Sequence, residues 1–258
     1  MPKFSANLSM LFTEVEFMER FQRAFGAGFK AVEFMFPYAY EAGRLADMLN
    51  KYGLKQALFN MPAGRWDAGE RGIAVLAERR GEFEDGVGTA IRYAKALDCS
   101  LVNCLAGLTP PGVPQERVRE VLAANLRFAA DMFAKEGIRL LIETINTRDI
   151  PGFYLSRTPH VLSIIREVNH PNLLWQFDIY HMQVTEGDLA TTIRNNIKTI
   201  GHIQLADNPG RHEPGTGEIN FPNLFRFIDE TGYTGYIGCE YKPLTTTEEG
   251  LDWVKPYL

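Results

Sequence analysis

The sequence predicts an α/β fold of the (β/α)8 TIM-barrel type, because strand-like and helix-like segments alternate eight times along its 258 residues. The strand-like segments are almost continuously apolar, as parallel strands covered on both faces are. No linker or change in composition divides the chain, and its length suits one barrel. We therefore expect a single TIM-barrel domain over residues 1–258, with an active site at the carboxyl ends of its strands.

The expected strands are short apolar or β-branched runs at 3–8, 30–36, 54–60, 100–106, 138–144, 173–179, 200–206 and 235–240. A doubly wound open sheet would show the same alternation of strands and helices. That fold often carries a glycine-rich phosphate-binding turn such as GxGxxG after a strand. No such turn follows any of the expected strands, which favours the closed barrel.

Capping residues mark several helix boundaries between these strands. Thr13 with Glu16 has the spacing of a capping box ahead of the first helix, and Thr246 with Glu249 repeats it near the end of the chain. Gly53 stands where the second helix should end, just before the third strand. These signals predict helices after the first, second and eighth strands.

The longest expected helix follows the fourth strand and presents one apolar stripe at helical spacing, formed by Val118, Leu122, Leu126, Ala129 and Phe133. Gly137 predicts where that helix stops. Thr158 followed by Pro159 is typical of a helix start, and Asn220 with Pro222 predicts another. Together with the strands, these helices complete the alternation expected of a barrel.

One connection is much longer than the others. Residues 61–84 follow the third strand and precede its helix. Long βα loops of a barrel lie at the active-site end and often act as lids. Trp66 and Arg71 within this loop favour a cover over a polar ligand rather than a passive surface insertion.

Composition narrows the class of protein. The net charge is −5 with both signs interspersed, which argues against nucleic acid as a partner. No apolar run approaches the ~20 residues of a membrane helix, and the N-terminus lacks the layout of a signal peptide, so we expect a cytoplasmic protein with no membrane partner. The three cysteines, Cys99, Cys104 and Cys239, show no CxxC spacing, so we expect neither disulfides nor a zinc site, and Cys104 and Cys239 should be core residues.

The carboxyl ends of the last four expected strands carry the chemistry. Each places a carboxylate or an amide at the end of an apolar run: Glu143, Asp178, Gln204 and Glu240. A charged group there is costly unless it is paired or bound to a metal, and adjacent barrel strands converge at one mouth. Three carboxylates and an amide oxygen are hard ligands, so the pattern predicts one divalent metal ion, Mg2+ or Mn2+.

Candidate substrate-binding residues lie in loops on the same face. His181 could polarise a substrate oxygen, and Arg211 could grip a carboxylate through its two-pronged guanidinium. Arg71 in the long third loop and Lys242 after Glu240 are further candidates. The expected substrate is a small hydroxy-oxo acid.

The remaining histidines are weaker candidates. His202 shares a strand face with Gln204, and we expect it to be a core or supporting group rather than a ligand. His160 and His170 lie away from the mouth. His212 falls on the right loop, but the sequence assigns it no role.

Two carboxylates beside a divalent ion suggest proton transfer next to a carbonyl. The ion would chelate the carbonyl and hydroxyl oxygens of an α-hydroxy-carbonyl compound and stabilise the enediolate formed when a C–H proton leaves. One carboxylate would remove the proton and the other would return it. Glycoside hydrolysis also uses two carboxylates, but it needs no metal bridging them.

At this point the motifs resemble those of the hydroxypyruvate isomerases, members of the xylose-isomerase-like barrel superfamily, and the resemblance covers essentially the whole chain. The motifs include FSANLSMLF from residue 4, VEFMFPY from 32, PAGRWDAGERGIA from 62, FDIYHMQ from 177, ADNPGR from 206, EPGTGEIN from 213 and GCEYKP from 238. Runs of this length are highly specific for the family and less so for its substrate.

The resemblance implies that Glu143 and Glu240 are the acid–base pair and that these two, with Asp178 and Gln204, ligate one divalent ion. The implied reaction interconverts hydroxypyruvate and 2-hydroxy-3-oxopropanoate (tartronate semialdehyde). A 2-oxo-tetronate isomerase, with a substrate one carbon longer, and a ketose 3-epimerase are the alternatives on the same site. The epimerases typically have histidine where this chain has Gln204, and this difference disfavours the epimerase alternative.

Two other classes of protein fit this sequence less well than an isomerase does. A metal-dependent endonuclease on the same barrel needs a histidine-rich multi-zinc cluster and a basic face, and five scattered histidines at net charge −5 supply neither. A non-enzymatic sugar-binding barrel would not need a carboxylate at each end of a metal. The sequence leaves the oligomeric state open, including a homo-oligomer.

Overall fold

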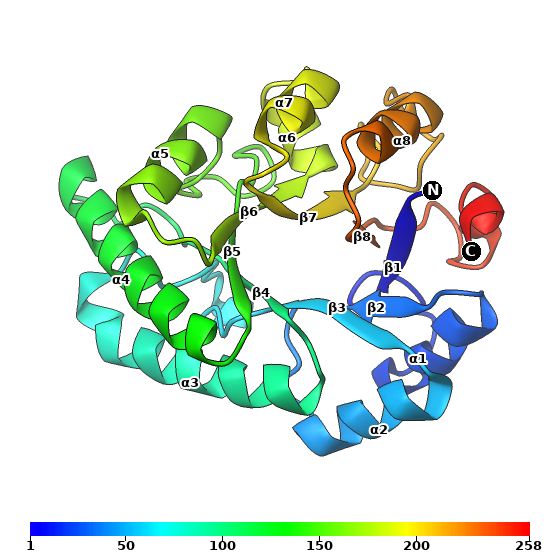
Figure 1. Cartoon of the computed structure of the whole chain (residues 1–258), viewed down its shortest axis with the longest axis horizontal. Helices are drawn as coiled ribbons and strands as arrows, with labels where there is room; N and C mark the ends of the chain where they lie inside the picture. The colour runs from blue at the N-terminus through cyan, green and yellow to red at the C-terminus, as the bar shows by residue number, and fades with distance from the viewer.

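The computed structural model describes residues 1–258 and shows a closed barrel of eight parallel strands in chain order (Figure 1). The strands are β1 (Lys3–Asn7), β2 (Ala31–Glu33), β3 (Lys55–Asn60), β4 (Leu101–Cys104), β5 (Arg139–Glu143), β6 (Leu173–Asp178), β7 (Ile200–Leu205) and β8 (Tyr236–Cys239). Pairing of β1 with β8 closes the barrel. The predicted fold class is confirmed.

Helices surround the barrel on the outside (Figure 1). They are α1 (Phe17–Gly26), α2 (Ala42–Tyr52), α3 (Arg80–Ala96), α4 (Gln115–Lys135), α5 (Thr158–Val168), α6 (Ile179–Thr185), α7 (Leu189–Asn196) and α8 (Phe221–Glu230). Two helices, α6 and α7, lie between β6 and β7. None of the helices is long and apolar enough to cross a membrane.

Several predicted helix boundaries are confirmed. Gly53 follows α2 in the left-handed conformation with φ 62°, a conformation that glycine adopts without strain. Asn220 caps α8 by accepting a hydrogen bond from the backbone N–H of Asn223 at 3.2 Å. Helix α5 begins at Thr158, and α4 ends just before Gly137. Local capping signals therefore located these helices within a residue or two.

The capping box predicted at Thr13 is wrong. Helix α1 begins at Phe17, and no side chain caps its first turn. Thr13 lies in a turn ahead of the helix, and Thr247 holds this turn in place. The Oγ1 of Thr247 accepts a hydrogen bond from the N–H of Phe12 at 2.6 Å, and the N–H of Thr247 donates to Glu14 at 2.6 Å. These tertiary hydrogen bonds prevail over the local helix-start signal.

The α-helix predicted after the eighth strand is also wrong in type. Thr246 and Glu249 do bond to each other's backbone N–H at 3.4 Å, but they open only two 3-10 turns, η3 (Glu249–Leu251) and η4 (Lys255–Tyr257). Pro256 lacks an N–H and would break a longer helix. The tail instead packs Trp253 edge-to-face on Phe4 at 5.2 Å between ring centroids.

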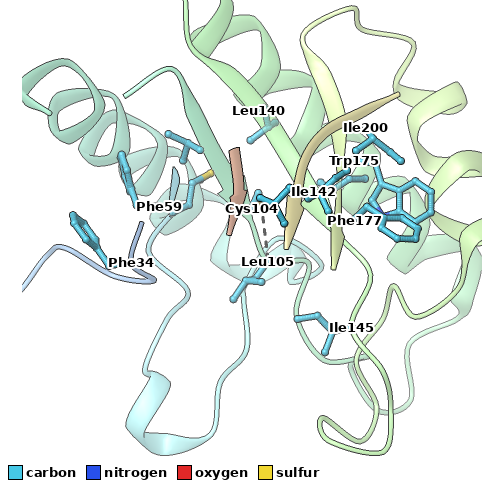
Figure 2. Close-up of a cluster of buried hydrophobic side chains, with 14 of the residues drawn as sticks. Phe34, Phe59, Cys104, Leu105, Leu140, Ile142, Ile145, Trp175, Phe177 and Ile200 are labelled. Carbon is cyan, nitrogen blue, oxygen red and sulfur yellow. Dashed lines mark hydrogen bonds between the residues drawn. The ribbon is translucent and has the colours of Figure 1, made fainter. Parts of the chain in front are cut away.

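The core lies between the sheet and the helices, and large apolar side chains from neighbouring strands fill it (Figure 2). Trp175 and Phe177 of β6 pack edge-to-face at 5.0 Å. Each such fully buried side chain contributes roughly 1.5–3 kcal/mol. Cys104 and Cys239 are buried free thiols, as predicted, and so is Cys99.

The long loop after β3 is shorter than predicted, because α3 begins at Arg80 rather than after residue 84. It contains two 3-10 turns, η1 (Trp66–Ala68) and η2 (Ala77–Arg79). The part of this loop around Val75 is hydrogen-bonded to the loop after β4, because the N–H of Val75 donates to the carbonyl of Ala106 at 3.1 Å. A Cβ on Gly72 would overlap the backbone there, so the two loops touch directly.

Candidate active site

The strand ends place the four predicted residues around the mouth of the barrel. Glu143 and Asp178 are the last residues of β5 and β6, Gln204 lies near the end of β7, and Glu240 directly follows β8. All four side chains are buried. A cavity of about 710 Å³ opens beside them, and Glu143 and Glu240 contribute to its wall.

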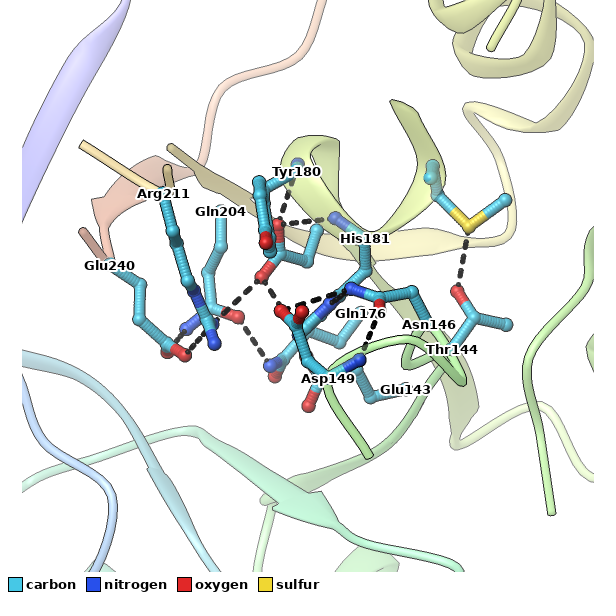
Figure 3. A network of polar contacts seen from close by, with 12 residues as sticks. Glu143, Thr144, Asn146, Asp149, Gln176, Tyr180, His181, Gln204, Arg211 and Glu240 are labelled. Carbon is cyan, nitrogen blue, oxygen red and sulfur yellow. Dashed lines mark hydrogen bonds and ion pairs between the residues drawn. The ribbon is translucent and has the colours of Figure 1, made fainter. Parts of the chain in front are cut away.

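Arg211 is the cation that holds two of the mouth carboxylates (Figure 3). Its Nη2 lies 2.7 Å from Glu240 Oε1 and 3.5 Å from Asp178 Oδ2. The guanidinium also lies over the ring of Tyr180, 5.2 Å from its centroid. Its Nε is buried and has no hydrogen-bond partner, so one donor of this side chain remains available.

Asp178 has one satisfied and one unsatisfied oxygen. Oδ1 accepts hydrogen bonds from the backbone N–H groups of Tyr180 at 2.8 Å and His181 at 3.3 Å, at the start of α6. Oδ2 is buried without any hydrogen bond. A buried carboxylate oxygen with no donor is costly, which marks this point as a site for a positively charged ligand.

Glu143 and Glu240 have perturbed acidities. Burial, followed by repulsion from Glu240 and Asp178, raises the pKa of Glu143 well above its usual value, although Asn103 donates to it at 3.0 Å. Burial raises the pKa of Glu240 to about 8, even though Arg211 favours its ionised form. Both carboxyls therefore hold a proton more readily than an exposed glutamate, as groups that exchange protons in catalysis do.

Gln204 links Glu240 to two further polar side chains, Glu33 and Gln176. Its Nε2 donates to Glu240 Oε2 at 2.6 Å and to Glu33 Oε1 at 2.7 Å, while its Oε1 accepts from Gln176 at 2.6 Å. The amide nitrogen, rather than the oxygen, therefore faces Glu240 in this structure.

His181 joins the group from the first turn of α6. Atoms of Glu143, Asp178 and His181 that could each ligate a metal lie within 4.8 Å of one another. Burial, together with the charge of Arg211, lowers the pKa of His181 well below its usual value, so the imidazole is neutral. Asn146 contacts its Nδ1 at 2.7 Å and orients the ring, which leaves Nε2 toward the mouth carboxylates.

A sequence profile described as xylose isomerase-like TIM barrel matches residues 21–257. The chain belongs to this family. It is 54% identical to "Hydroxypyruvate isomerase" of Escherichia coli, over all of both chains. It is 48% identical to "2-oxo-tetronate isomerase" of Cupriavidus necator, over 100% of this chain and 99% of the relative.

Solved structures agree with this family fold. A Brucella melitensis protein described as "AP endonuclease, family 2" superposes with a TM-score of 0.98 at 45% identity, over 100% of this chain and 99% of the other. An L-ribulose 3-epimerase superposes with a TM-score of 0.78 at 22% identity, over 99% of this chain and 86% of the other. The second likeness shows the fold alone.

Two further candidate substrate contacts of this xylose isomerase-like barrel lie in different places. Lys242 lines the cavity near its rim. Arg71 does not: its guanidinium stacks on Trp66 at 4.2 Å and donates to the carbonyls of Trp66 and Glu70. Trp66 itself lines the cavity, so the long loop covers the site through its tryptophan rather than its arginine.

The other histidines of this family member lie apart from the cavity wall. His202 reaches Glu33 Oε2 with its Nε2 at 2.9 Å, the supporting position expected for it. His160 packs on Tyr154, and His170 lies 3.2 Å from Asp131. His212 donates from its Nδ1 to the carbonyl of Lys242, at 2.8 Å.

Polar residues at or near the ends of the first four strands, chiefly Asn7, Glu33 and Asn103, were not among the predicted site residues. Asn7 donates to Glu240 at 3.0 Å, much as Asn103 donates to Glu143. Burial would raise the pKa of Glu33, but the adjacent His202 and hydrogen bonds from its neighbours hold it below the usual value. The sequence signal that could have identified these three residues is a polar residue within an otherwise apolar strand-like run.

Proposed function

We propose that this protein is an isomerase that interconverts hydroxypyruvate and 2-hydroxy-3-oxopropanoate through an enediolate. The observation that carries the proposal is the pair Glu143 and Glu240, two buried carboxyls with raised pKa values on the wall of one cavity. Full-length identity of 54% to a hydroxypyruvate isomerase supports this substrate.

The residues of the mouth fit a divalent cation. Glu143, Asp178, Gln204 and Glu240 would hold it, Gln204 through the amide oxygen that accepts from Gln176 in this structure. The fit rests on Asp178 Oδ2, which lacks any donor, and on a donor set of hard oxygens suited to Mg2+ or Mn2+. When bound, such an ion supplies electrostatic stabilisation for negative charge on the substrate oxygens.

Glu143 and Glu240 would move the carbon-bound proton. The reaction removes a proton from C3 of hydroxypyruvate and adds one to C2, while the C3 hydroxyl loses its proton and the C2 carbonyl oxygen gains one. One carboxylate accepts the first proton, and the other, in its acid form, donates to the neighbouring carbon. The pKa of about 8 for Glu240 allows its acid form near neutral pH, and the raised pKa of Glu143 also favours a bound proton.

Arg211 and Lys242 would bind the substrate's carboxylate. Arg211 neutralises Glu240 and Asp178 in this structure, yet its Nε is free and it lies on the cavity wall. When another cation balances those carboxylates, more guanidinium N–H groups become available for a paired hydrogen bond to a carboxylate. His181, neutral and held by Asn146, would donate to a substrate oxygen.

A 2-oxo-tetronate isomerase is the second candidate, favoured by the 48% identical relative of that name. The cavity of about 710 Å³ also leaves room for an additional carbon. A sugar epimerase rests on fold likeness alone, and Gln204 departs from the histidine typical of that group. We expect action in the cytoplasm.

An endonuclease activity, as in the name of the Brucella melitensis protein, lacks support from the donor set. His181 is the one histidine in the cavity wall, whereas His160, His170 and His202 make their contacts elsewhere. The net charge of −5 also disfavours DNA. We therefore propose no nucleic-acid partner.

The deciding experiment compares substrates on one enzyme preparation. Chelated protein should be inactive, and Mg2+ or Mn2+ should restore turnover of hydroxypyruvate above that of four-carbon 2-oxo acids and neutral ketoses. Activity that persists after thorough metal removal contradicts the metal-assisted mechanism. A four-carbon acid turned over faster than hydroxypyruvate transfers the proposal to the 2-oxo-tetronate reaction.

A further inference from the structure

Glu33 at the end of β2 is a fully buried carboxylate that does not line the cavity. Its oxygens have four side-chain partners. Oε1 accepts hydrogen bonds from Gln204 at 2.7 Å and Asn7 at 3.2 Å, whereas Oε2 accepts from Ser5 at 2.8 Å and contacts His202 at 2.9 Å. No step proposed above uses this group.

The barrel makes room for this carboxylate at one position of β8. A Cβ on Gly238 would overlap both oxygens of Glu33. Gly238 pairs with Gln204 on one side and with Ser5 on the other, so the carboxylate lies beside the bottom of the active site. A side chain at position 238 would displace Glu33 from its partners.

Two of the partners of Glu33 also hold Glu240. The amide nitrogens of Asn7 and Gln204 each donate to Glu240 Oε2, at 3.0 and 2.6 Å. A carboxylate accepts hydrogen bonds and donates none when ionised. An ionised Glu33 therefore requires both amides to turn their NH2 groups toward it and toward Glu240.

The same requirement fixes the amide oxygens. With its NH2 group between Glu33 and Glu240, Gln204 must direct its oxygen toward β6, where it accepts from Gln176. Asn7 likewise directs its oxygen to the backbone N–H of Ser9, at 3.0 Å. A neutral residue in place of Glu33 would leave either orientation of the amides available.

We propose that Glu33 is a positioning residue of the active site, which sets the orientation of the Gln204 and Asn7 amides and through them the placement of Glu240. The proposal deepens the isomerase function and rests on it for its catalytic consequence. Groups that orient ligands and catalytic residues from behind typically change metal affinity or activity by ~10–100-fold.

The test compares Glu33→Gln with Ser5→Ala. Glu33→Gln keeps the size of the side chain but not its strict acceptor character, so kcat for hydroxypyruvate and the affinity for Mn2+ should fall by ~10–100-fold. Ser5→Ala removes one hydrogen bond to the other oxygen and leaves the two amides untouched. Its kcat and Mn2+ affinity should stay within about twofold of the wild type, well below the effect of a lost orienting group.

A direct readout is the side-chain NH2 signal of Gln204 in the NMR spectrum of the metal-free protein, identified by its loss in Gln204→Glu. The signal should be protected from solvent exchange in the wild type and in Ser5→Ala, and should shift and exchange faster in Glu33→Gln. Unchanged signals in Glu33→Gln, or equal kcat losses in both variants, overturn the proposal.

Gly238→Ala gives a second route that keeps every charge and hydrogen-bonding group. It should reproduce the Glu33→Gln effects, and it decides the matter if Glu33→Gln does not fold. If the wild type fails to isomerise hydroxypyruvate, the proposed function is wrong, whereas the Gln204 signals still test the role of Glu33.

Discussion

The two halves of the barrel mouth carry different chemistry. At or within a residue of their carboxyl ends, the first four strands carry mostly amides: Asn7, Glu33, Asn60 and Asn103. The last four carry mostly carboxylates there: Glu143, Asp178, Gln204 and Glu240. Each half contains one exception, and the two exceptions, Glu33 and Gln204, are bonded to each other.

The difference shows how mutually repelling carboxylates can be kept together in a buried site. Amides of the first half donate to carboxylates on the adjoining strands, from Asn103 of β4 to Glu143 of β5 and from Asn7 of β1 to Glu240 after β8. Arg211 adds a positive charge from the loop after β7. The first half therefore supplies hydrogen-bond donors to the carboxylates for which we propose proton transfer.

The largest expected effect comes from neutralising the carboxylate half. Glu143→Gln and Glu240→Gln should each lower kcat by ~10²–10⁴-fold while the fold persists, because a positioned acid or base contributes that much. The double variant should lose far less than the product of the two, since both residues serve one proton path. Steady-state kinetics and circular dichroism measure this, and multiplicative losses contradict a shared path.

Arg211→Lys tests the cation that pairs with the carboxylate half, through Asp178 and Glu240. The change keeps the charge but loses the paired hydrogen bonds, each worth ~1.5–3 kcal/mol, so KM for hydroxypyruvate should rise by roughly tenfold or more. The surface variant Arg80→Lys is the control. If a neutral ketose is affected as strongly as the acid, Arg211 does not bind the substrate carboxylate.

Asn103→Ala tests the donor half at a residue outside the cavity wall. Loss of its hydrogen bond to Glu143 should reduce kcat by about tenfold, the lower end of what supporting residues contribute. Asn172→Ala is the matched control, because it removes an amide that bonds the carbonyls of Ala130 and Ile138 at the amino ends of β5 and β6, opposite the mouth. Equal kcat in the two variants at equal melting temperature would falsify an orienting role.

The smallest expected effect is a pH dependence of stability. Because folding raises the pKa of Glu143 and Glu240, the folded protein binds more protons than the unfolded chain above the ordinary value of 4.5. The metal-free protein should therefore lose stability as pH rises from about 4.5 to about 8. Saturating Mg2+ should flatten this slope in melting curves, and a rising Tm over that range contradicts the assignment.

Much of the fold could be predicted from local pattern. Apolar runs gave the strands, and Gly53 and Asn220 gave helix ends, since backbone conformation and capping are decided by near neighbours. The turn at Thr13 could not be predicted, because Thr247 holds it from the far end of the chain. Pro256 could have been used to predict that no long helix forms after the eighth strand.

The site residues also fall into some that local sequence pattern predicts and others that depend on tertiary structure. Glu143 and Asp178 could be predicted, since a carboxylate at the end of a buried strand has few harmless explanations. Glu33 was missed because the predicted strand continued to residue 36, whereas β2 ends at Glu33 itself. The contact between Arg211 and Glu240 depends on the path of a loop, and sequence spacing does not determine that path.

The pairing of Arg211 with the mouth carboxylates has a consequence for electroneutrality. Glu143, Asp178 and Glu240 in their ionised forms face a single guanidinium, so the mouth retains two uncompensated negative charges. A doubly charged cation cancels that remainder, whereas Na+ or K+ leaves half of it. With all three carboxyls ionised, the count of charges around the mouth would favour a divalent over a monovalent cation, before size or ligand geometry contributes.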